Sequence, residues 1–269
     1  MRGRLFVSLG ALALVGIFTY GSRGSLGLFI KPWEEEFGAS RGSVSLISSV
    51  GFVALGLGQP VAGRLLELME GRAVLVAGLV LASAGFVGAA FAGELWVALL
   101  LIGVVASFGG GLSSLSSLSY LAADLVDRRQ GAIFGILTAA SAGGQVVVLP
   151  IATAALGVSL RASLLTLGVI LAVTAIATLA LVRPVAPARL SASQGRIGAL
   201  ARIPEFWYLL VPFFVCGYTT TGLIDTHLIP HAVDHHIAET TASSALATLA
   251  AFNMAGVLLA GIASDRVDR

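Results

Sequence analysis

Apolar residues gather into eight long runs along the chain, each bounded by charged or turn-forming residues. A helix needs about twenty mostly apolar residues to cross the roughly 30 Å hydrocarbon core of a bilayer, and each run reaches this length. Because a backbone exposed to lipid must satisfy its own hydrogen bonds, we predict that all eight runs are transmembrane helices. The predicted spans are residues 5–30, 44–62, 73–92, 95–121, 131–156, 162–182, 206–230 and 242–263.

The composition is that of a membrane protein. Hydrophobic residues make up 57% of the 269 residues and charged residues 11%, against about 25% charged residues in a soluble domain. The net charge of +2 comes from scattered basic residues, whereas nucleic-acid binding needs a clustered basic face. Cys216 is the single cysteine, which excludes an intrachain disulfide and a cysteine metal cluster. We therefore expect an all-α polytopic bundle whose partner is the lipid bilayer and not a nucleic acid.

The basic residues indicate how the chain is oriented. Twelve of the sixteen Lys and Arg residues fall in one set of connections between spans, whereas Lys31, Arg41 and Arg161 fall in the other. Connections rich in Lys and Arg stay in the cytoplasm. Since the termini lie on the same side as the twelve basic residues, both termini of this chain are expected to be cytoplasmic.

A short pattern occurs twice at a constant offset. Gly63 and Glu67 end the second span, and Gly261 and Asp265 end the eighth, in each case 198 residues later. The longest polar connection, residues 183–204, contains four arginines and separates six spans from two. This predicts an internal repeat, with a six-helix half at 1–183, a cytoplasmic linker at 184–204 and an incomplete second half at 205–269. On this interpretation the chain is a fragment whose missing partner is the remaining C-terminal helices of the same protein.

Six helices, a basic linker and a duplicated G-x-x-x-[DE] loop resemble the major facilitator superfamily. Residues 20–29, 36–41, 58–63 and 252–261 further resemble its bacterial monocarboxylate-transporter-like branch. The resemblance covers essentially the whole chain and implies twelve helices in two six-helix halves, in the bacterial inner (plasma) membrane. It also implies a gating loop at two places, formed by Gly63, Glu67, Gly71, Arg72, Gly261, Asp265 and Arg266. The first copy departs from the family pattern, because Glu67 and Leu68 replace an Asp and an Arg.

The two glycines and acids of this loop also have a local interpretation. Gly63 and Gly261 are expected to let neighbouring helix backbones approach closely. The acid four residues later is expected to accept from the amides of the helix that follows.

Arg23 is the strongest candidate for a binding residue, because a charge within a span is costly unless it faces a partner or water. Gly16, Tyr20, Arg23 and Gly27 share one helical face, so small residues flank the guanidinium. The branch that the chain resembles has Lys or Arg at this place, where it binds the substrate carboxylate. The alternative is that Arg23 extends to the interface as a long cationic side chain near the end of its span.

Asp225 is the one carboxylate within the predicted spans, on a helical face with Tyr218 and Gly222. Its helix would be the repeat counterpart of the first, so we expect Asp225 and Arg23 to pair across a central cavity and to couple binding to protons. The alternative is an interfacial acid near the end of the helix.

Three further polar side chains are candidates for the cavity lining. Gln145 and Asn253 are amides that need partners in lipid, so each lines a cavity or joins two helices. Tyr120 ends a hydroxyl-rich stretch, residues 113–120, which we expect to pack closely beside Gly109 to Gly111. Val257 stands where organic-anion members of the wider family often have a second Arg, which argues against a dicarboxylate substrate.

The four histidines, His227, His231, His235 and His236, lie within ten residues. Their spacing leaves open a metal site, a protonation-sensitive loop or a plain solvated loop. Pro230 is expected to interrupt the helix, which argues against the metal. The sequence has no nucleophile triad, P-loop or dinucleotide fingerprint, so we expect no enzyme activity, no cofactor and no metal.

These features together favour one function. We expect a secondary transporter of a small organic anion, with a monocarboxylate as the leading candidate, that works by alternating access and with possible proton coupling. The alternatives are a non-transporting membrane subunit or scaffold and an exporter of a lipophilic compound. The loop repeated at one offset favours the transporter.

Overall fold

The computed structural model describes residues 2–125, 130–187 and 202–264, which form helices and contain no strand. Eight of the helical stretches in these ranges are long and apolar enough to cross a membrane. They agree with the predicted spans to within a few residues at nearly every boundary. The periodicity and length of the apolar runs therefore determined the number and place of the spans.

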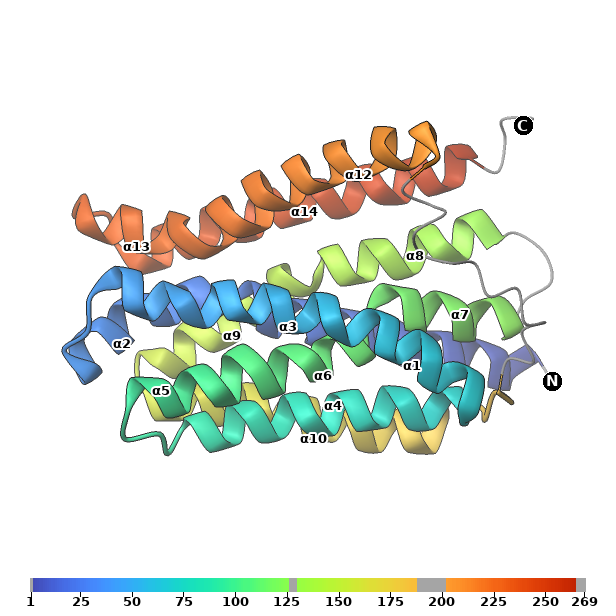
Figure 1. Cartoon of the computed structure of the whole chain (residues 1–269), viewed down its shortest axis with the longest axis horizontal. Helices are drawn as coiled ribbons and strands as arrows, with labels where there is room; N and C mark the ends of the chain where they lie inside the picture. The colour runs from blue at the N-terminus through green and yellow to red at the C-terminus, as the bar shows by residue number, and fades with distance from the viewer. Residues whose placement is uncertain (1, 126–129, 188–201, 265–269) are drawn as a thin grey trace.

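The spans run antiparallel along one long axis, and α1 begins at the same end of the bundle at which α14 finishes (Figure 1). We call this the terminal end, and the other the opposite end. The spans consist of α1 (Arg2–Gly24), η1 (Leu26–Phe29) and α2 (Ile30–Phe37); α3 (Arg41–Leu68); α4 (Gly71–Ala89); α5 (Leu95–Ala98), η2 (Leu99–Ala106), α6 (Ser107–Leu112) and α7 (Leu115–Leu125); α8 (Gln130–Ala142) and α9 (Gly144–Leu156); α10 (Leu160–Leu181); α12 (Pro204–Cys216), η3 (Gly217–Asp225) and α13 (Thr226–Asp234); and α14 (Glu239–Ser264).

Local sequence explains where two of these spans begin. Gly38 has a φ of 58° and ends α2 in the left-handed region, which glycine adopts without steric cost. Ser40 then caps α3 by accepting from the amide of Ser43. Ser159 caps α10 in the same way, through the amide of Ala162.

The first six spans pack through glycines that bring helix backbones together. A Cβ at Gly78 would lie 2.6 Å from the Gly109 carbonyl oxygen, and one at Gly58 would lie 2.7 Å from that of Phe108. Gly111 faces Gly58 at similarly short range. Gly109 and Gly111 thus join α6 to α4 and α3. Of the hydroxyls expected to pack beside them, Ser113 donates to the Gly109 carbonyl oxygen at 3.1 Å. Small residues serve this purpose in membranes because interhelical attraction comes mainly from van der Waals contact.

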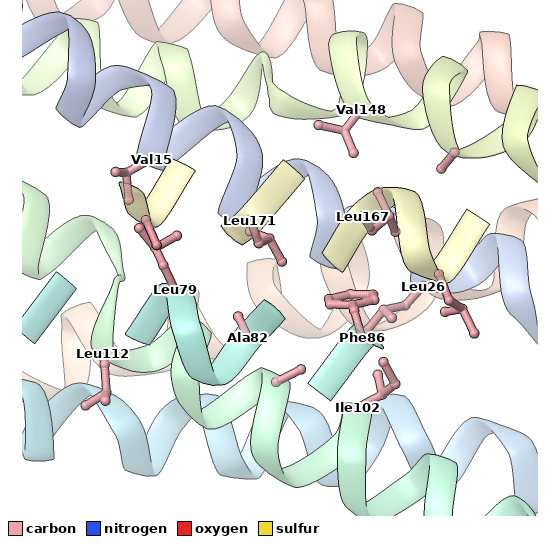
Figure 2. Close-up of a cluster of buried hydrophobic side chains, with 14 of the residues drawn as sticks. Val15, Leu26, Leu79, Ala82, Phe86, Ile102, Leu112, Val148, Leu167 and Leu171 are labelled. Carbon is pink, nitrogen blue, oxygen red and sulfur yellow. The ribbon is translucent and has the colours of Figure 1, made fainter. Parts of the chain in front are cut away.

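Apolar side chains from several spans fill the centre of this group. Figure 2 shows Val15 of α1, Leu79 and Phe86 of α4, and Leu167 and Leu171 of α10 converging in one cluster, each at most 5% exposed. The cluster continues through Ile102 of η2 and Leu26 of η1 (Figure 2). It fixes the segment of α1 that ends at Arg23.

The last two spans lie along α8, α9 and η1 (Figure 1). Glycines bring backbone atoms of the two groups together at two places, and a Cβ at Gly143 would also lie 2.6 Å from the side-chain sulfur of Met254. At the terminal end, a Cβ at Gly261 would lie 2.8 Å from the Gly135 Cα. Towards the opposite end, a Cβ at Gly27 would lie 2.5 Å from the Asp225 carbonyl oxygen. The functional cavity lies between these contacts.

Two stretches have π-helical winding, η2 in the fourth span and η3 in the seventh. Hydrogen bonds in a π-helix join residue i to i+5, which shifts the side chains that follow relative to an α-helix. Both stretches end beside the cavity: η2 ends directly before Ser107, and η3 ends at Asp225. This winding changes which residues of the seventh span face inward.

Candidate functional site

A cavity of about 210 Å³ lies between the first six spans and the last two. Side chains from both groups line it, and many of them are polar. The polar and charged lining residues are Tyr20, Arg23, Ser48, Ser107, Thr138, Ser141, Gln145, Thr220, Thr221, Asp225, Thr226 and Asn253. Arg23 and Asp225 are the two charged residues of the described lining, so the site offers one cation and one anion.

Arg23 points into this cavity and not towards the interface. Its guanidinium carbon lies 4.8 Å from the centre of the Phe52 ring, a cation–π contact. Within the described residues no hydrogen bond or ion pair joins the guanidinium to a protein acceptor. The stacking therefore holds the group in place while its donors stay free for a ligand.

Glycines on α1 place Arg23 close to the fifth span. A Cβ at Gly16 would lie 2.6 Å from the Ser141 hydroxyl, and one at Gly21 would lie 2.5 Å from the Gly144 carbonyl oxygen. At Gly24 a Cβ would overlap the side chain of Gln145. These small residues let α1 approach α8 and α9 closely. Of the two glycines predicted to share a face with Arg23, Gly16 contacts the fifth span and Gly27 the seventh.

Asp225 faces the same cavity from the end of η3. Its carboxylate interacts with the side-chain amide of Gln145 and, through its charge, with Arg23. No guanidinium nitrogen of Arg23 lies within the 4.0 Å of an ion pair from this described carboxylate. The expected direct pairing is therefore wrong for this structure, because the two groups stand on separate parts of the cavity wall. Space for a ligand remains between the first and seventh spans.

The cavity brings together five of the six candidate binding residues. Tyr20, Arg23, Gln145, Asp225 and Asn253 all line it. Tyr120 does not, although we expected it to. Its hydroxyl donates to the Ala186 carbonyl oxygen at 3.5 Å, near the end of the sixth span. Tyr120 lies five residues beyond Leu115, which lines the cavity, so it stands about one and a half turns further towards the terminal end.

The prediction of which residues of the seventh span face the cavity is also wrong. An α-helical period groups Tyr218 and Gly222 with Asp225, yet Thr220 and Thr221 line the cavity with it. Tyr218 is 66% exposed. Thr221 precedes Asp225 by four residues and would share its face in an α-helix too, whereas Thr220 precedes it by five, a spacing that the π winding of η3 brings to one side.

The first copy of the expected gating loop is built differently from the prediction. A Cβ at Gly63 would meet nothing within 4 Å, so this glycine makes no close helix approach. Glu67 lies inside α3 and pairs with Arg64 one turn away, instead of accepting from the next helix.

The rest of that loop ties α4 to the segment after α10. The Gly71 amide donates to the Val185 carbonyl oxygen at 3.1 Å, and Arg72 donates to that of Leu179 at 3.0 Å. In the second copy, Gly261 makes the expected close contact with Gly135. Asp265 and Arg266 lie outside the described residues.

Four charged residues form a cluster at the opposite end of the bundle. Lys31 and Glu34 belong to α2, Arg41 begins α3, and Asp234 ends α13. Asp234 pairs with both Lys31 and Arg41. Glu34 pairs with Lys31 at 3.4 Å and with Arg41 at 2.7 Å. This charged cluster connects the first six spans to the last two next to the Gly27 contact.

The histidine-rich stretch begins in helix and ends in the turn after it. His227 and His231 lie in α13, which continues through Pro230, so the expected interruption is wrong. The rings of His231 and His235 meet edge to face at 4.5 Å between centroids. Within the described ranges, no group of three or more His, Cys, Asp or Glu side chains is arranged to hold a metal ion.

Residues 12–269 match the Major Facilitator Superfamily. The chain is 25% identical over 251 residues to the MFS-type transporter YcxA of Bacillus subtilis, covering 90% of this chain and 61% of YcxA. It is 34% identical over 132 residues to human monocarboxylate transporter 11, covering 49% of this chain and 28% of that protein. The chain thus spans less than two thirds of the length of these relatives.

Solved structures share the fold. A bacterial homologue of the human lysosomal transporter Spinster, inward-facing and unoccupied, superposes with a TM-score of 0.76 at 16% identity, over 99% of this chain and 64% of that one. The xylose transporter XylE of E. coli, in an inward-open conformation, gives a TM-score of 0.56 at 17% identity, over 77% of this chain and 56% of XylE. Eight membrane-spanning helices arranged as six and two, a cavity between the groups and a match over nearly the whole sequence lead to one conclusion: the chain belongs to the major facilitator superfamily.

Proposed function

We propose that this chain forms the binding site of a secondary transporter for a small monocarboxylate, which crosses the membrane by alternating access. The observation that carries the proposal is the Arg23 guanidinium, which faces the cavity, is held by Phe52 and has no protein acceptor among the described residues. A planar guanidinium matches the two oxygens of a carboxylate with parallel hydrogen bonds. The names of the relatives, which include monocarboxylate transporters, support the same substrate class.

The cavity suits an anion with a single carboxylate. Arg23 is the one cationic residue of the described lining, so a second carboxylate would have no partner of opposite charge. Tyr20, Gln145 and Asn253 supply hydrogen bonds for a carbonyl or hydroxyl substituent. A dicarboxylate is therefore expected to bind more weakly than a monocarboxylate of similar size.

Asp225 provides a means of proton coupling. It shares the cavity with Arg23, so a substrate carboxylate bound there experiences repulsion from an ionised Asp225. A proton on Asp225 removes that repulsion and favours the anion. Binding of substrate and binding of a proton would then support each other, as symport requires.

The contacts at the two ends of the cavity are candidates for the gates. The charged cluster around Asp234 and the Gly27 contact would close the opposite end, and the Gly135–Gly261 contact would close the terminal end. Alternating access requires that these contacts form in turn.

The orientation of the gates follows from the basic connections. We place both termini of this chain on the cytoplasmic side of a bacterial plasma membrane, so the charged cluster would be external. A cysteine at Ala238 should then react with an impermeant reagent added to intact cells, and a cysteine at Ser193, outside the described residues, should react only after lysis. The reverse pattern contradicts the orientation.

Equilibrium binding of radiolabelled pyruvate and propionate to the purified chain in lipid nanodiscs tests the proposal. Arg23→Ala should weaken binding by at least about a hundredfold, the effect of removing a buried charge partner. Arg23→Lys keeps the charge without the planar fork and should weaken it less. Arg161→Ala, outside the cavity, is the matched control and should bind as the unmodified chain does. Equal affinity in Arg23→Ala, or a preference for an amine over these acids, would overturn the substrate class.

A further inference from the structure

A second, smaller cavity lies directly behind Arg23. Its volume is about 20 Å³, and Arg23, Leu26 and Ser107 form the wall that separates it from the larger cavity. The remainder of its lining comes from the packed interior of the first six spans. Arg23 therefore borders the larger, polar cavity on one side and the small cavity on the other.

Two hydroxyl groups in this small cavity have no hydrogen-bond partner within the protein. Thr19 is 7% exposed and Ser22 is 1% exposed, and both side-chain oxygens are buried without a partner. Buried polar groups are nearly always hydrogen-bonded, so two such hydroxyls at one site need an explanation. Both line the small cavity.

The helical period of α1 places the two hydroxyls on a face that also carries Arg23. Thr19, Ser22 and Arg23 are separated by three and four residues, so they share one helical face. Tyr20 and Gly24 lie on the adjacent face, which lines the larger cavity. Arg23 belongs to both faces and can respond to what occupies either space.

The rest of the wall limits what can enter. Apolar side chains from α4, η2 and α10 line the small cavity, namely Ala82, Phe86, Ile102 and Leu171 (Figure 2). The Ser107 hydroxyl already donates to the Ile102 carbonyl oxygen at 2.9 Å, so it can only accept from an occupant. An occupant must be about the size of one water molecule and must both donate and accept.

We propose that this cavity binds a single water molecule that accepts from the Arg23 guanidinium and bonds to the hydroxyls of Thr19 and Ser22. A water needs about 10–15 Å³ and two to four polar partners, which the site provides. The water holds the guanidinium from behind, so Thr19 and Ser22 are positioning residues for carboxylate binding. This role rests on the proposed function, whereas the water site itself does not.

Radiolytic hydroxyl labelling of the chain in nanodiscs, read by mass spectrometry, tests the site without any substrate. Phe86 is 5% exposed, so an ordered neighbouring water is the source that would oxidise it. Labelling of Phe86 is expected in the unmodified chain and in Thr19→Ser, which keeps the hydroxyl. Labelling of Phe86 should be lost in the double variant Thr19→Val with Ser22→Ala. Valine has nearly the shape of threonine but lacks the hydroxyl. Absence of labelling in the unmodified chain, or labelling that survives in the double variant, overturns the proposal.

Carboxylate binding in the same preparations tests the positioning role. The double variant should weaken pyruvate binding by about tenfold, and Thr19→Ser by less than about twofold, as expected for a lost hydrogen bond to a charged group. Equal affinity in the double variant overturns the positioning role. Absence of carboxylate binding in every protein, with the labelling pattern intact, would refute the proposed function and leave the water site standing. Phe86 labelling that falls as chloride is added would assign the cavity to a halide and contradict the water.

Discussion

The interior of the first six spans and their interface with the last two are built by different means. Inside the first six, glycines put backbones in contact at several levels, as at Gly58 with Gly111 and Gly78 with Gly109. At the interface, the glycine contacts with another backbone lie towards the ends, at Gly27 and Gly261, with the cavity between them and the charged cluster at one end. Gly143, between these ends, faces the flexible side chain of Met254 instead of a backbone. Backbone contact is rigid, since a packed interior does not deform continuously. Ion pairs and a cavity can open without repacking, which suits two bodies that move relative to each other.

The largest expected effect comes from adding one methyl group inside the first six spans. In Gly109→Ala the new Cβ would overlap the carbonyl of Gly78 and the amide of Ala82. We expect the free energy of unfolding to fall by about 1–3 kcal/mol, measured by thermal or denaturant unfolding in detergent micelles. Gly56→Ala is the matched control, because nothing lies within 4 Å of a Cβ at Gly56. A Gly109→Ala chain as stable as Gly56→Ala would show that this interior is not rigid.

A smaller effect is expected for the pH dependence of substrate binding, which we attribute to Asp225 in the cavity. If one proton on Asp225 accompanies each anion, affinity for pyruvate should rise as pH falls, by up to about tenfold per pH unit. The sign follows because protonation removes a negative charge that faces the anion. Asp225→Asn should bind at high pH and show a flat profile, whereas Glu205→Gln, on the exposed start of α12, should keep the slope. A slope that persists in Asp225→Asn would assign the coupling to another group.

Disrupting the charged cluster should have a still smaller effect, on how readily the cavity is reached from the external side. Asp234→Asn removes two ion pairs that are partly exposed, which are worth little individually. We expect a cysteine at Thr221, in a Cys216→Ser background, to react about fivefold faster with an impermeant thiol reagent from the external side. Glu94→Gln, which carries no ion pair to a described residue, should leave the rate unchanged. An unchanged rate in Asp234→Asn would mean that the Gly27 contact closes this end alone.

The smallest effect is expected outside the interface. Tyr120→Phe removes a hydroxyl that bonds to Ala186 and does not line the cavity. Its affinity for pyruvate should stay within about twofold of the unmodified chain, measured by the same equilibrium binding. A large loss would place Tyr120 in the binding site after all.

The spans could be predicted from the sequence because each depends on local composition alone. The cavity residues Arg23, Gln145, Asp225 and Asn253 could be predicted for a related reason, since a polar group within a span is costly and marks a protein- or water-facing position. Neither inference needed knowledge of which helices are neighbours.

The rest could not be predicted, because it depends on contacts between distant parts of the chain. Phe52 stacks on Arg23, yet a phenylalanine within an apolar run carries no signal of its own. Arg41 and Asp234 are separated by 193 residues, so their pairing depends on tertiary structure. Thr220 faces the cavity together with Asp225, five residues later, because η3 has π winding, which a periodicity of 3.6 cannot reveal. Gly63 was expected to allow a close helix contact and makes none, because the sequence alone does not indicate whether another backbone lies beside a glycine.

Under the proposed function, the pair of charges in the cavity would also determine how the membrane voltage acts on transport. With Arg23 and Asp225 both ionised, the described lining carries no net charge. A bound monocarboxylate adds one negative charge, and a proton on Asp225 cancels it. A net charge that crosses the bilayer gains or loses about 2.3 kcal/mol per 100 mV. A cycle that carries one anion with one proton would therefore be electroneutral. The concentration ratios of the acid and of protons across the membrane would alone set its direction.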